Sequence, residues 1–243
     1  MRDFIFIGLV MLFQNASFKD VQLKNSRVKE AYQNKESIVK NYFKLKSLTY
    51  DGFHLFIRAF KKEEKLEVWI MEKGKDEFIL LQTYSFCASS GILGPKRKEG
   101  DSQIPEGIYY LNHFNPLSNF YLSLGVNYPN ASDKILSDKK HPGGDIYIHG
   151  NCVTIGCIPL TDDKIKEVYI LAVEARNNGQ EKIMIHIFPD RLEQGMIEKL
   201  EIEYSSSKII LDFWKNLQPI YLDFKTSRKV KAVKVNDLGE YHL

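Results

Sequence analysis

The chain has 243 residues, of which 44% are hydrophobic and 27% are charged, and its formal net charge is +3. This composition is typical of a globular protein, and the length suffices for one substantial core with a smaller appendage. The charge is too small, and the lysines are too evenly mixed with Asp and Glu, for a protein that binds nucleic acid.

Residues 1–17 have the pattern of a secretory signal peptide. Arg2 precedes the apolar run Phe4–Phe13, which is too short to span a membrane. A cleavage site is expected at Asn15–Ser17, and no cysteine directly follows that would anchor a lipoprotein. The alternative is a buried N-terminal strand. The signal-peptide interpretation predicts export to the periplasm or cell envelope, with no stable membrane span after processing.

The hydrophobic pattern predicts an α+β fold that is mainly β. Residues 26–46 carry an imperfect helical stripe of apolar side chains. From Phe53 the period changes to two, which predicts antiparallel strands in GFHLFIRAF, KLEVWIME and EFILLQTYSF. IPEGIYYLN and KIMIHIFP are further strands, and residues 191–204 form a short amphipathic helix. We therefore expect a mixed, mainly β body with flanking helices.

Two irregular segments separate these strands. The loop from Ala88 to Pro105 contains the basic run Lys96–Lys98, which forms either a solvated surface or a rim that attracts carboxylates. The segment YLSLGVNYPNASDKI, with HPGG after it, is polar and predicts a long lid beside a site.

The stretch HGNCVTIGCIPLTD, from His149 to Asp162, pairs a histidine with a cysteine eight residues later. Cysteine is a strong nucleophile as the thiolate, and a nearby imidazole is a common means of producing one. His149 and Cys157 are therefore the candidate catalytic pair. A glycine adjoins each of them, Gly150 and Gly156.

Alternation around this pair predicts its local geometry. In DIYIHG, Ile148 should face the core while His149 lies on the accessible face. Val153 and Ile155 alternate with polar residues or glycine, which predicts a second short strand that ends before Cys157. Two strands joined by a tight connection would bring the imidazole and the thiol side by side.

Thr161 predicts the N-cap of the next helix, with Asp162 and Asp163 in its first turn. The helix should extend to about Asn178. Its expected buried stripe consists of Ile165, Val168, Tyr169, Ala172 and Ala175.

His149-Gly150, Thr154-Ile155-Gly156-Cys157 and the following Asp together resemble the L,D-transpeptidase catalytic domain (YkuD) family. The short spacing and the GCIPLTD ending are similar to its YafK-like branch, and the similarity runs from about Ser26 to Arg191. The resemblance implies a periplasmic enzyme that acts on peptidoglycan stem peptides, with Cys157 as nucleophile and His149 as base. Many members have Arg two residues after the cysteine, able to hold a substrate carboxylate, but here that residue is Pro159.

This chemistry predicts a thioester on Cys157. Backbone N–H groups of Gly156 and Cys157 should stabilise the oxyanion, with Thr154 and Gly150 supporting the loop. The acyl group then passes to an amine, which gives cross-links or protein attachment, or to water. The hydrolytic alternative is an L,D-carboxypeptidase, or an amidase that releases a wall-attached protein. A thiol activated by His149 should also react with alkylating agents well below a pKa of about 8.5.

Four further residues are candidates for substrate binding, because they lie in the irregular segments before the catalytic stretch. They are Lys96, Arg97, Tyr121 and His141. No cofactor is expected. His186 lies on the polar side of its strand with no motif beside it, so we expect a partly buried structural histidine.

Cys87 and Cys152 either form a disulfide or remain buried thiols, and buried thiols are slightly favoured. Cys152 is also a rival nucleophile. A different class of protein, a non-catalytic zinc- or wall-binding module, would use His141, His149, Cys152 and Cys157 as ligands. Their spacing does not match paired zinc knuckles, so no metal site is predicted.

The expected domains are a catalytic domain at 18–204, which includes the N-terminal helix, and a C-terminal extension at 205–243. The extension should contain one helix and two short strands. It either binds the wall or a partner, or clamps the sheet.

Overall fold

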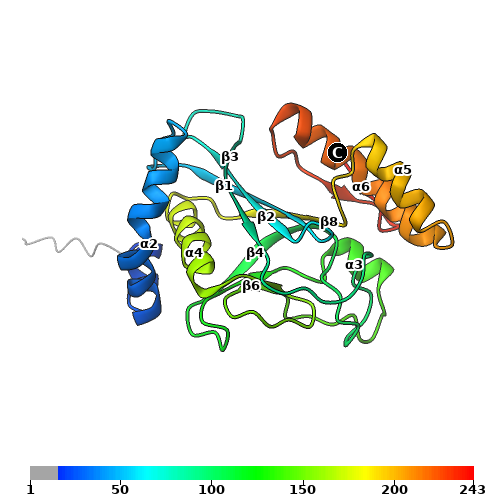
Figure 1. Ribbon diagram of the computed structural model, residues 1–243, viewed down its shortest axis with the longest axis horizontal. Coiled ribbons are helices and arrows are strands. Elements are labelled where there is room, and N and C mark those ends of the chain that lie inside the picture. The colour runs from blue at the N-terminus through cyan, green and yellow to red at the C-terminus, as the bar shows by residue number, and fades with distance from the viewer. Residues whose placement is uncertain (1–15) are drawn as a thin grey trace, which may run out of the picture.

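The computed structural model describes residues 16–243. The strands predicted from the two-residue period belong to one eight-stranded sheet (Figure 1). The order across the sheet is β3-β2-β1-β8-β4-β5-β6-β7. Pairing is antiparallel except between β1 and β8 and between β6 and β7, so the expected mixed sheet is confirmed. The strands are β1 (His54–Phe60), β2 (Lys65–Met71), β3 (Ile79–Ser85), β4 (Gly107–Asn115), β5 (Ser123–Val126), β6 (Tyr147–His149), β7 (Ile158–Pro159) and β8 (Met184–Phe188).

Helices cover both faces of this sheet (Figure 1). Because successive side chains of a strand point to opposite faces, β1 contributes to two cores. Leu55 and Ile57 pack in one core with α2 (Ser26–Leu45) and α4 (Asp162–Asn177). Phe60 packs in the other with α5 (Gln194–Glu203) and α6 (Lys208–Ser227). The short helix α1 (Phe18–Gln22) precedes α2 and contacts α4.

Helix α4 forms as the sequence predicts. Thr161 is its N-cap, and the Thr161 side chain accepts a hydrogen bond from the backbone N–H of Lys164. The acidic side chains of Asp162 and Asp163 lie in the first turn, where their negative charges interact favourably with the positive end of the helix dipole. All five residues of the predicted stripe are fully buried. The helix therefore gives the catalytic stretch before it a rigid neighbour.

The C-terminal residues pack against the sheet. Helix α6 buries Phe213, Trp214, Tyr221 and other apolar side chains against the core that contains Phe60. The indole Nε1 of Trp214 donates a 2.7 Å hydrogen bond to the carboxylate of Glu106. A two-stranded sheet of β9 (Lys234–Val235) and β10 (Tyr241–His242) follows α6, which is the predicted set of one helix and two strands.

His186 is buried between the sheet and α6 and is not part of the cavity that contains His149 and Cys157. It is 2% exposed, more deeply buried than the sequence predicts, and its ring packs edge-on against Phe56 at 4.7 Å. Its neighbour across the sheet is Arg58, which is also buried. Neither ring nitrogen of His186 has a hydrogen-bond partner within the described chain. Its role is therefore in packing.

The predicted lid is wrong for much of its length. Residues Ser123–Val126 form the fully buried strand β5, paired with β4 and β6, and Ala131–Leu136 form helix α3. Four residues are too few to show a clear period, so only the pairing partners reveal this strand. Residues 137–146, including HPGG, remain irregular.

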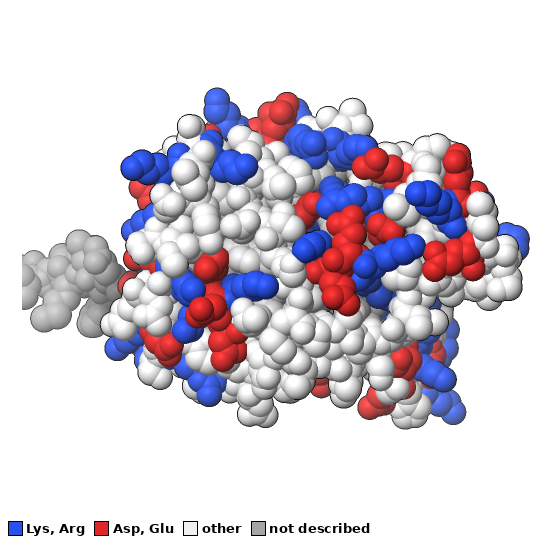
Figure 2. Space-filling model, viewed as in Figure 1, with Lys and Arg blue, Asp and Glu red and all other residues white. Residues whose placement is uncertain are grey.

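On the face drawn in Figure 2, basic and acidic side chains are interspersed and do not form a stripe of one sign. This distribution matches the mixed charge pattern of the sequence. Within residues 16–243, no helix is both long and apolar enough to cross a membrane. The predicted signal-peptide core at Phe4–Phe13 lies outside the described residues.

Candidate active site

The parallel pairing of β6 with β7 brings the candidate catalytic residues together. Ile148 pairs with Ile158 and His149 pairs with Pro159, so Cys157, which directly precedes β7, stands beside Tyr147. Ile148 and Ile158 are fully buried on one face of the sheet. His149 and Cys157 are their sequence neighbours and therefore share the opposite face.

The predicted strand before Cys157 is wrong, because the strand begins after it. Residues 150–157 form an irregular loop in which Val153 is 49% exposed and Ile155 is 84% exposed. Asn151 and Gly156 have positive φ values of 61° and 134°, which are incompatible with a continuous strand. Alternation in this loop therefore does not reflect a buried face.

Thr154 holds this loop in place. Its Oγ1 accepts hydrogen bonds from the backbone N–H groups of Gly156 at 3.1 Å and Cys157 at 2.8 Å. The same hydroxyl donates to the carbonyl of Cys157 at 2.8 Å. Both N–H groups expected to stabilise an oxyanion are therefore occupied, and that expectation does not hold in this arrangement.

Neighbouring atoms lie so close to the two motif glycines that a side chain at either position would collide with them. A Cβ on Gly156 would lie 2.9 Å from the backbone oxygen of Gln103. A Cβ on Gly150 would lie 2.6 Å from the Asp162 carboxylate and 2.9 Å from the backbone oxygen of Phe120. Gly150 and Gly156 thus allow the loop to pack tightly against its surroundings.

His149 and Cys157 line the same cavity, which has a volume of about 360 Å3. The side chains around it are mainly apolar or neutral, and they come from the end of β6, from the 150–157 loop and from the segments before β5 and β6. The lining residues are Phe120, Asp145, His149, Val153, Thr154, Ile155 and Cys157.

The tautomer of His149 follows from its hydrogen bond. Its Nδ1 lies 2.5 Å from the carbonyl oxygen of Gly150, which can only accept, so Nδ1 carries the proton. The Nε2 atom is then free to accept a proton, as a general base requires. The ring packs on Phe120 with centroids 4.7 Å apart. His149 is only 1% exposed, so the predicted accessible face is wrong, although the residue does line the cavity.

Burial lowers the pKa of His149, and the hydrogen bond to Gly150 only partly opposes this effect. Burial also raises the pKa of the Cys157 thiol, although the backbone N–H of Tyr147 acts in the opposite direction. The thiol donates a 3.5 Å hydrogen bond to the carbonyl of Asp145. These shifts favour a neutral imidazole and a neutral thiol at rest, which is opposite in direction to the low thiol pKa that the sequence predicts.

Cys87 and Cys152 form a disulfide, with Cα atoms 5.3 Å apart, so the preference for buried thiols is wrong. Cys157 is the free cysteine among the described residues. The disulfide removes Cys152 as a rival nucleophile and as a zinc ligand. Within residues 16–243, no group of three or more His, Cys, Asp or Glu residues is arranged to hold a metal ion.

The four residues predicted to bind substrate do not line this cavity. Lys96 is buried in a 2.6 Å ion pair with Asp101, and Arg97 lies 3.4 Å from Asp133. Both cations are therefore neutralised by carboxylates. His141 is exposed on the surface, with Nδ1 3.9 Å from a carboxylate oxygen of Glu99.

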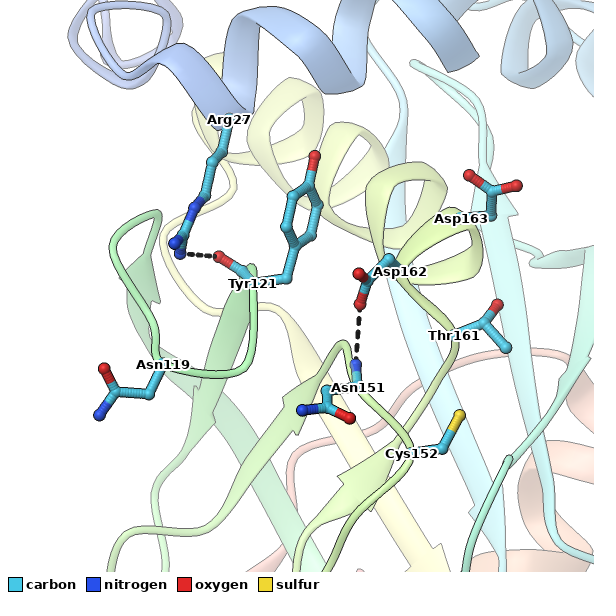
Figure 3. Close-up of a pocket in the computed structure, with 8 residues that line it drawn as sticks. All are labelled: Arg27, Asn119, Tyr121, Asn151, Cys152, Thr161, Asp162 and Asp163. Carbon is cyan, nitrogen blue, oxygen red and sulfur yellow. Dashed lines mark hydrogen bonds between the residues drawn. The ribbon is translucent and has the colours of Figure 1, made fainter.

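Tyr121 belongs to a separate cavity of about 770 Å3, shown in Figure 3. There Arg27 donates to the carbonyl of Tyr121 at 2.7 Å, and the backbone N–H of Asn151 donates to Asp162 at 2.9 Å. Neither His149 nor Cys157 lines this space. It is larger than the cavity around the thiol but lacks a nucleophile, because Cys152 is in the disulfide.

The family model for the L,D-transpeptidase catalytic domain (YkuD) matches residues 56–186. The chain is also 34% identical over 186 residues to "Putative L,D-transpeptidase YafK" of Escherichia coli strain K12, covering 76% of this chain and 72% of the relative. The chain belongs to the YkuD family of L,D-transpeptidase catalytic domains. This confirms the resemblance stated from the motif residues, including the similarity to YafK.

Solved structures with a related arrangement include the helical cell shape determining protein Pgp2 of Campylobacter jejuni. It has 20% identity and a TM-score of 0.45, and the match covers 78% of this chain and 75% of that one. Bd1075 of Bdellovibrio bacteriovorus has 23% identity and a TM-score of 0.41, covering 68% and 58%.

Two residues of this YkuD site were not foreseen. Phe120 forms the surface on which His149 packs, and Asp145 places its carbonyl against the thiol of Cys157. Phe120 is far from the motif in sequence and reaches His149 only through the sheet. Asp145 is the first residue of the run DIYIHG that predicted a strand, so its positive φ of +53° was not expected; the only local hint is the pair of glycines before it.

Proposed function

We propose that the chain is a cysteine acyltransferase of the L,D-transpeptidase type that acts on peptidoglycan stem peptides in the cell envelope. The observation that supports this most directly is the free thiol of Cys157 in one cavity with His149, whose Nε2 is available as a base. Membership of the YkuD family supports the peptidoglycan substrate.

In the proposed first half-reaction, Nε2 of His149 takes the thiol proton while Sγ of Cys157 attacks the carbonyl of a peptide bond between an L-centre and a D-centre. The C–N bond then breaks. The imidazolium returns the proton to the departing nitrogen, which leaves as a neutral amine. A thioester to Cys157 remains.

In the second half-reaction, an amine attacks the thioester carbonyl and His149 takes a proton from the attacking nitrogen. The C–S bond breaks, a new amide forms, and the proton returns to the sulfur. Water as acceptor gives a carboxylic acid by the same steps. The exposed apolar side chains of Val153 and Ile155 at the cavity favour transfer, because a substrate that covers them excludes water.

The test is incubation of the purified protein with muropeptides, followed by mass spectrometry of both the products and the peptide that contains Cys157. We expect an acyl adduct on Cys157 and amide or acid products. Cys157→Ala should abolish both, because no thioester forms without the sulfur. Product formation by Cys157→Ala at the wild-type rate would overturn the assignment.

We further propose that the protein is exported by the N-terminal segment. Mature protein from the native host should begin near Ala16 to Lys19 and fractionate with the envelope. Recovery of Met1 at the N-terminus of cytosolic protein would contradict a wall substrate.

A further inference from the structure

The positive charge of this protein is concentrated in its first two helices. Residues 16–46, which contain α1 and α2, have eight basic and three acidic side chains, a net charge of +5. The whole chain carries +3, and Arg2 and Asp3 cancel within residues 1–15, so residues 47–243 carry −2. Basic and acidic residues are therefore balanced over most of the chain but not in this segment. Such an asymmetry indicates an anionic partner for the basic part.

Carboxylates leave much of this charge unneutralised. Lys19, Lys35 and Lys40 form ion pairs with acidic side chains. Four other lysines of the segment are exposed and form no ion pair within residues 16–243. These unpaired lysines are Lys24, Lys29, Lys44 and Lys46.

The helices at the opposite end of the molecule have the reverse pattern (Figure 1). From Gln194 to Ser227, which spans α5 and α6, there are four basic and five acidic side chains. Three of their lysines form ion pairs, Lys208 with Asp212, Lys215 with Glu201 and Lys225 with Glu193. Unpaired lysines are thus not a general property of the surface helices of this protein.

Helix stability does not account for the lysine at the start of α2. This helix has no acidic side chain in its first turn, and Lys29 is its fourth residue, where a positive charge opposes the helix dipole. Lys44 lies in the last turn, where the dipole does favour it. Because lysines occur at both ends of α2, the charge of the segment points to an interaction outside the chain.

We propose that the unpaired lysines dock the protein on a bilayer surface rich in anionic phospholipid. A bilayer fits this segment better than a soluble polyanion, because the apolar side chain of Leu45, between Lys44 and Lys46, is 72% exposed. Leu45 can enter the headgroup layer while the ammonium groups on either side contact phosphates. The inference goes beyond the proposed acyl transfer and rests on the proposed export only for the membrane that the protein meets.

Docking through these helices leaves the cavity around Cys157 unoccupied by lipid. The residues that line this cavity all lie between Phe120 and Cys157, and none belongs to α1 or α2. A bilayer against the unpaired lysines therefore does not compete with a substrate. The docked protein keeps its site for the wall that adjoins the membrane.

The experiment measures cosedimentation of the full-length protein with two kinds of vesicle. One kind contains phosphatidylglycerol and phosphatidylcholine in equal parts, and the other contains phosphatidylcholine alone. The apolar run Phe4–Phe13, where it is retained, would bind to both kinds, so the difference between them reports the charge. Wild-type protein should bind the anionic vesicles on the order of 100-fold more tightly. This preference should disappear as the ionic strength rises from about 0.01 M to about 1 M, because the Debye length falls from about 30 Å to about 3 Å.

Two variants test the residues themselves. The triple variant Lys29→Gln, Lys44→Gln and Lys46→Gln should bind anionic vesicles little better than phosphatidylcholine. Leu45→Ser should weaken binding to the anionic vesicles roughly 5-fold, because an apolar side chain no longer enters the headgroup layer. Unchanged binding in Leu45→Ser would overturn the bilayer as the partner and leave a soluble polyanion.

The matched control replaces Lys208, Lys215 and Lys225 by Gln, which changes the net charge by the same amount at the other end of the molecule. Exposed ion pairs contribute little to stability, so this variant should fold and keep the wild-type preference. An equal loss in the two triple variants, or no preference in the wild type, would overturn docking through α1 and α2. Acylation of Cys157 by muropeptides in solution should be the same in both triple variants and the wild type. Its absence from the wild type would overturn the proposed function and leave the docking standing.

Discussion

The thiol of Cys157 donates its hydrogen bond to the backbone carbonyl of Asp145, 3.5 Å away, and not to His149. Because burial raises the thiol pKa and lowers the imidazole pKa, no ion pair forms between Cys157 and His149 at rest. The proton must therefore pass to His149 during attack. If the thiol is neutral at rest, its reactivity toward an alkylating agent does not depend on His149, whereas catalytic turnover does. A preformed thiolate would make both depend on His149.

Replacement of His149 should separate these properties experimentally. In His149→Gln we expect turnover to fall on the order of 100-fold or more, because the general base is lost. The pH dependence of Cys157 alkylation by iodoacetamide should change little, since the resting thiol is not bonded to the imidazole. In both proteins the alkylation rate should rise only above the ordinary thiol range, because the folded-state pKa is raised.

The measurement follows Cys157 by peptide mapping across a pH series. Cys87 and Cys152 contribute little background while their disulfide is intact. A wild-type alkylation midpoint below pH 8 that moves upward in His149→Gln would indicate a resting ion pair and contradict the neutral pair.

Thr154 offers a second test, because one hydroxyl holds three backbone groups of the catalytic loop. Thr154→Val keeps the side-chain shape but leaves the N–H groups of Gly156 and Cys157 without their acceptor. Loss of such partners costs about 1–3 kcal/mol. We expect kcat/KM to fall on the order of 10-fold or more as the thiol is displaced.

Thr154→Ser is the control, because serine retains the hydroxyl at the same position. It should keep most of the activity and the wild-type alkylation rate of Cys157. If Thr154→Val were as active as Thr154→Ser, the hydroxyl would not be needed to order the loop.

The local patterns of the sequence predicted the elements that carry strong, self-contained signals. Helix α4 has a capping threonine, two acidic residues in its first turn and a regular apolar stripe, and it forms within one residue of the predicted end. His149 and Cys157, which line one cavity, were likewise singled out as a pair from a short motif. In each case the residues that decide the outcome lie within one turn or one loop of each other.

The failures concern features that depend on residues far apart in the chain. Whether Arg97 is available to a substrate depends on Asp133, which only the folded chain brings within 3.4 Å. The disulfide joins Cys87 to Cys152 across a separation of 65 residues, and composition cannot determine such a pairing. Strand β5 is recognised only by its partners on both sides. Non-local pairing thus decided which predicted site residues reach the cavity.

Removal of the disulfide should destabilise the protein. Cys152 lies in the loop that carries Thr154 and Cys157, and the bond ties this loop to the end of β3 through Cys87. In the loop-closure model, a bond closing about 65 residues contributes about 4 kcal/mol. We expect the paired replacement of Cys87 and Cys152 by Ser to lower the free energy of unfolding by about 2–4 kcal/mol.

Urea denaturation of the double variant and the wild-type protein measures this difference. A parallel sample of wild type with Cys157 alkylated controls for the remaining thiol. Limited proteolysis should also cut residues 150–157 faster in the double variant. Equal stability and equal cleavage would show that the bond does not constrain the loop.

His186 makes the stability of the fold dependent on pH. Burial, with a smaller contribution from nearby Arg58, lowers its folded-state pKa to about 3, whereas the unfolded chain has an ordinary value of about 6.5. Below pH 6.5 the unfolded state therefore binds a proton that the folded state does not. The free energy of unfolding therefore does not depend on the protonation of His186 above pH 6.5. As the pH falls from 6.5 toward 3, the free energy of unfolding decreases by at most about 1.4 kcal/mol per pH unit.

Replacement of His186 by Phe should remove that part of the dependence. Phenylalanine preserves the aromatic packing against Phe56 and Phe188 and leaves no ring nitrogen buried without a partner. We expect the unfolding free energy of His186→Phe to decline less steeply between pH 6.5 and pH 4 than that of the wild type. Replacement of the exposed His141 by Gln is the control and should follow the wild-type curve. Parallel curves for His186→Phe and the wild type would mean that His186 keeps an ordinary pKa in the folded protein and would contradict the effect of its burial.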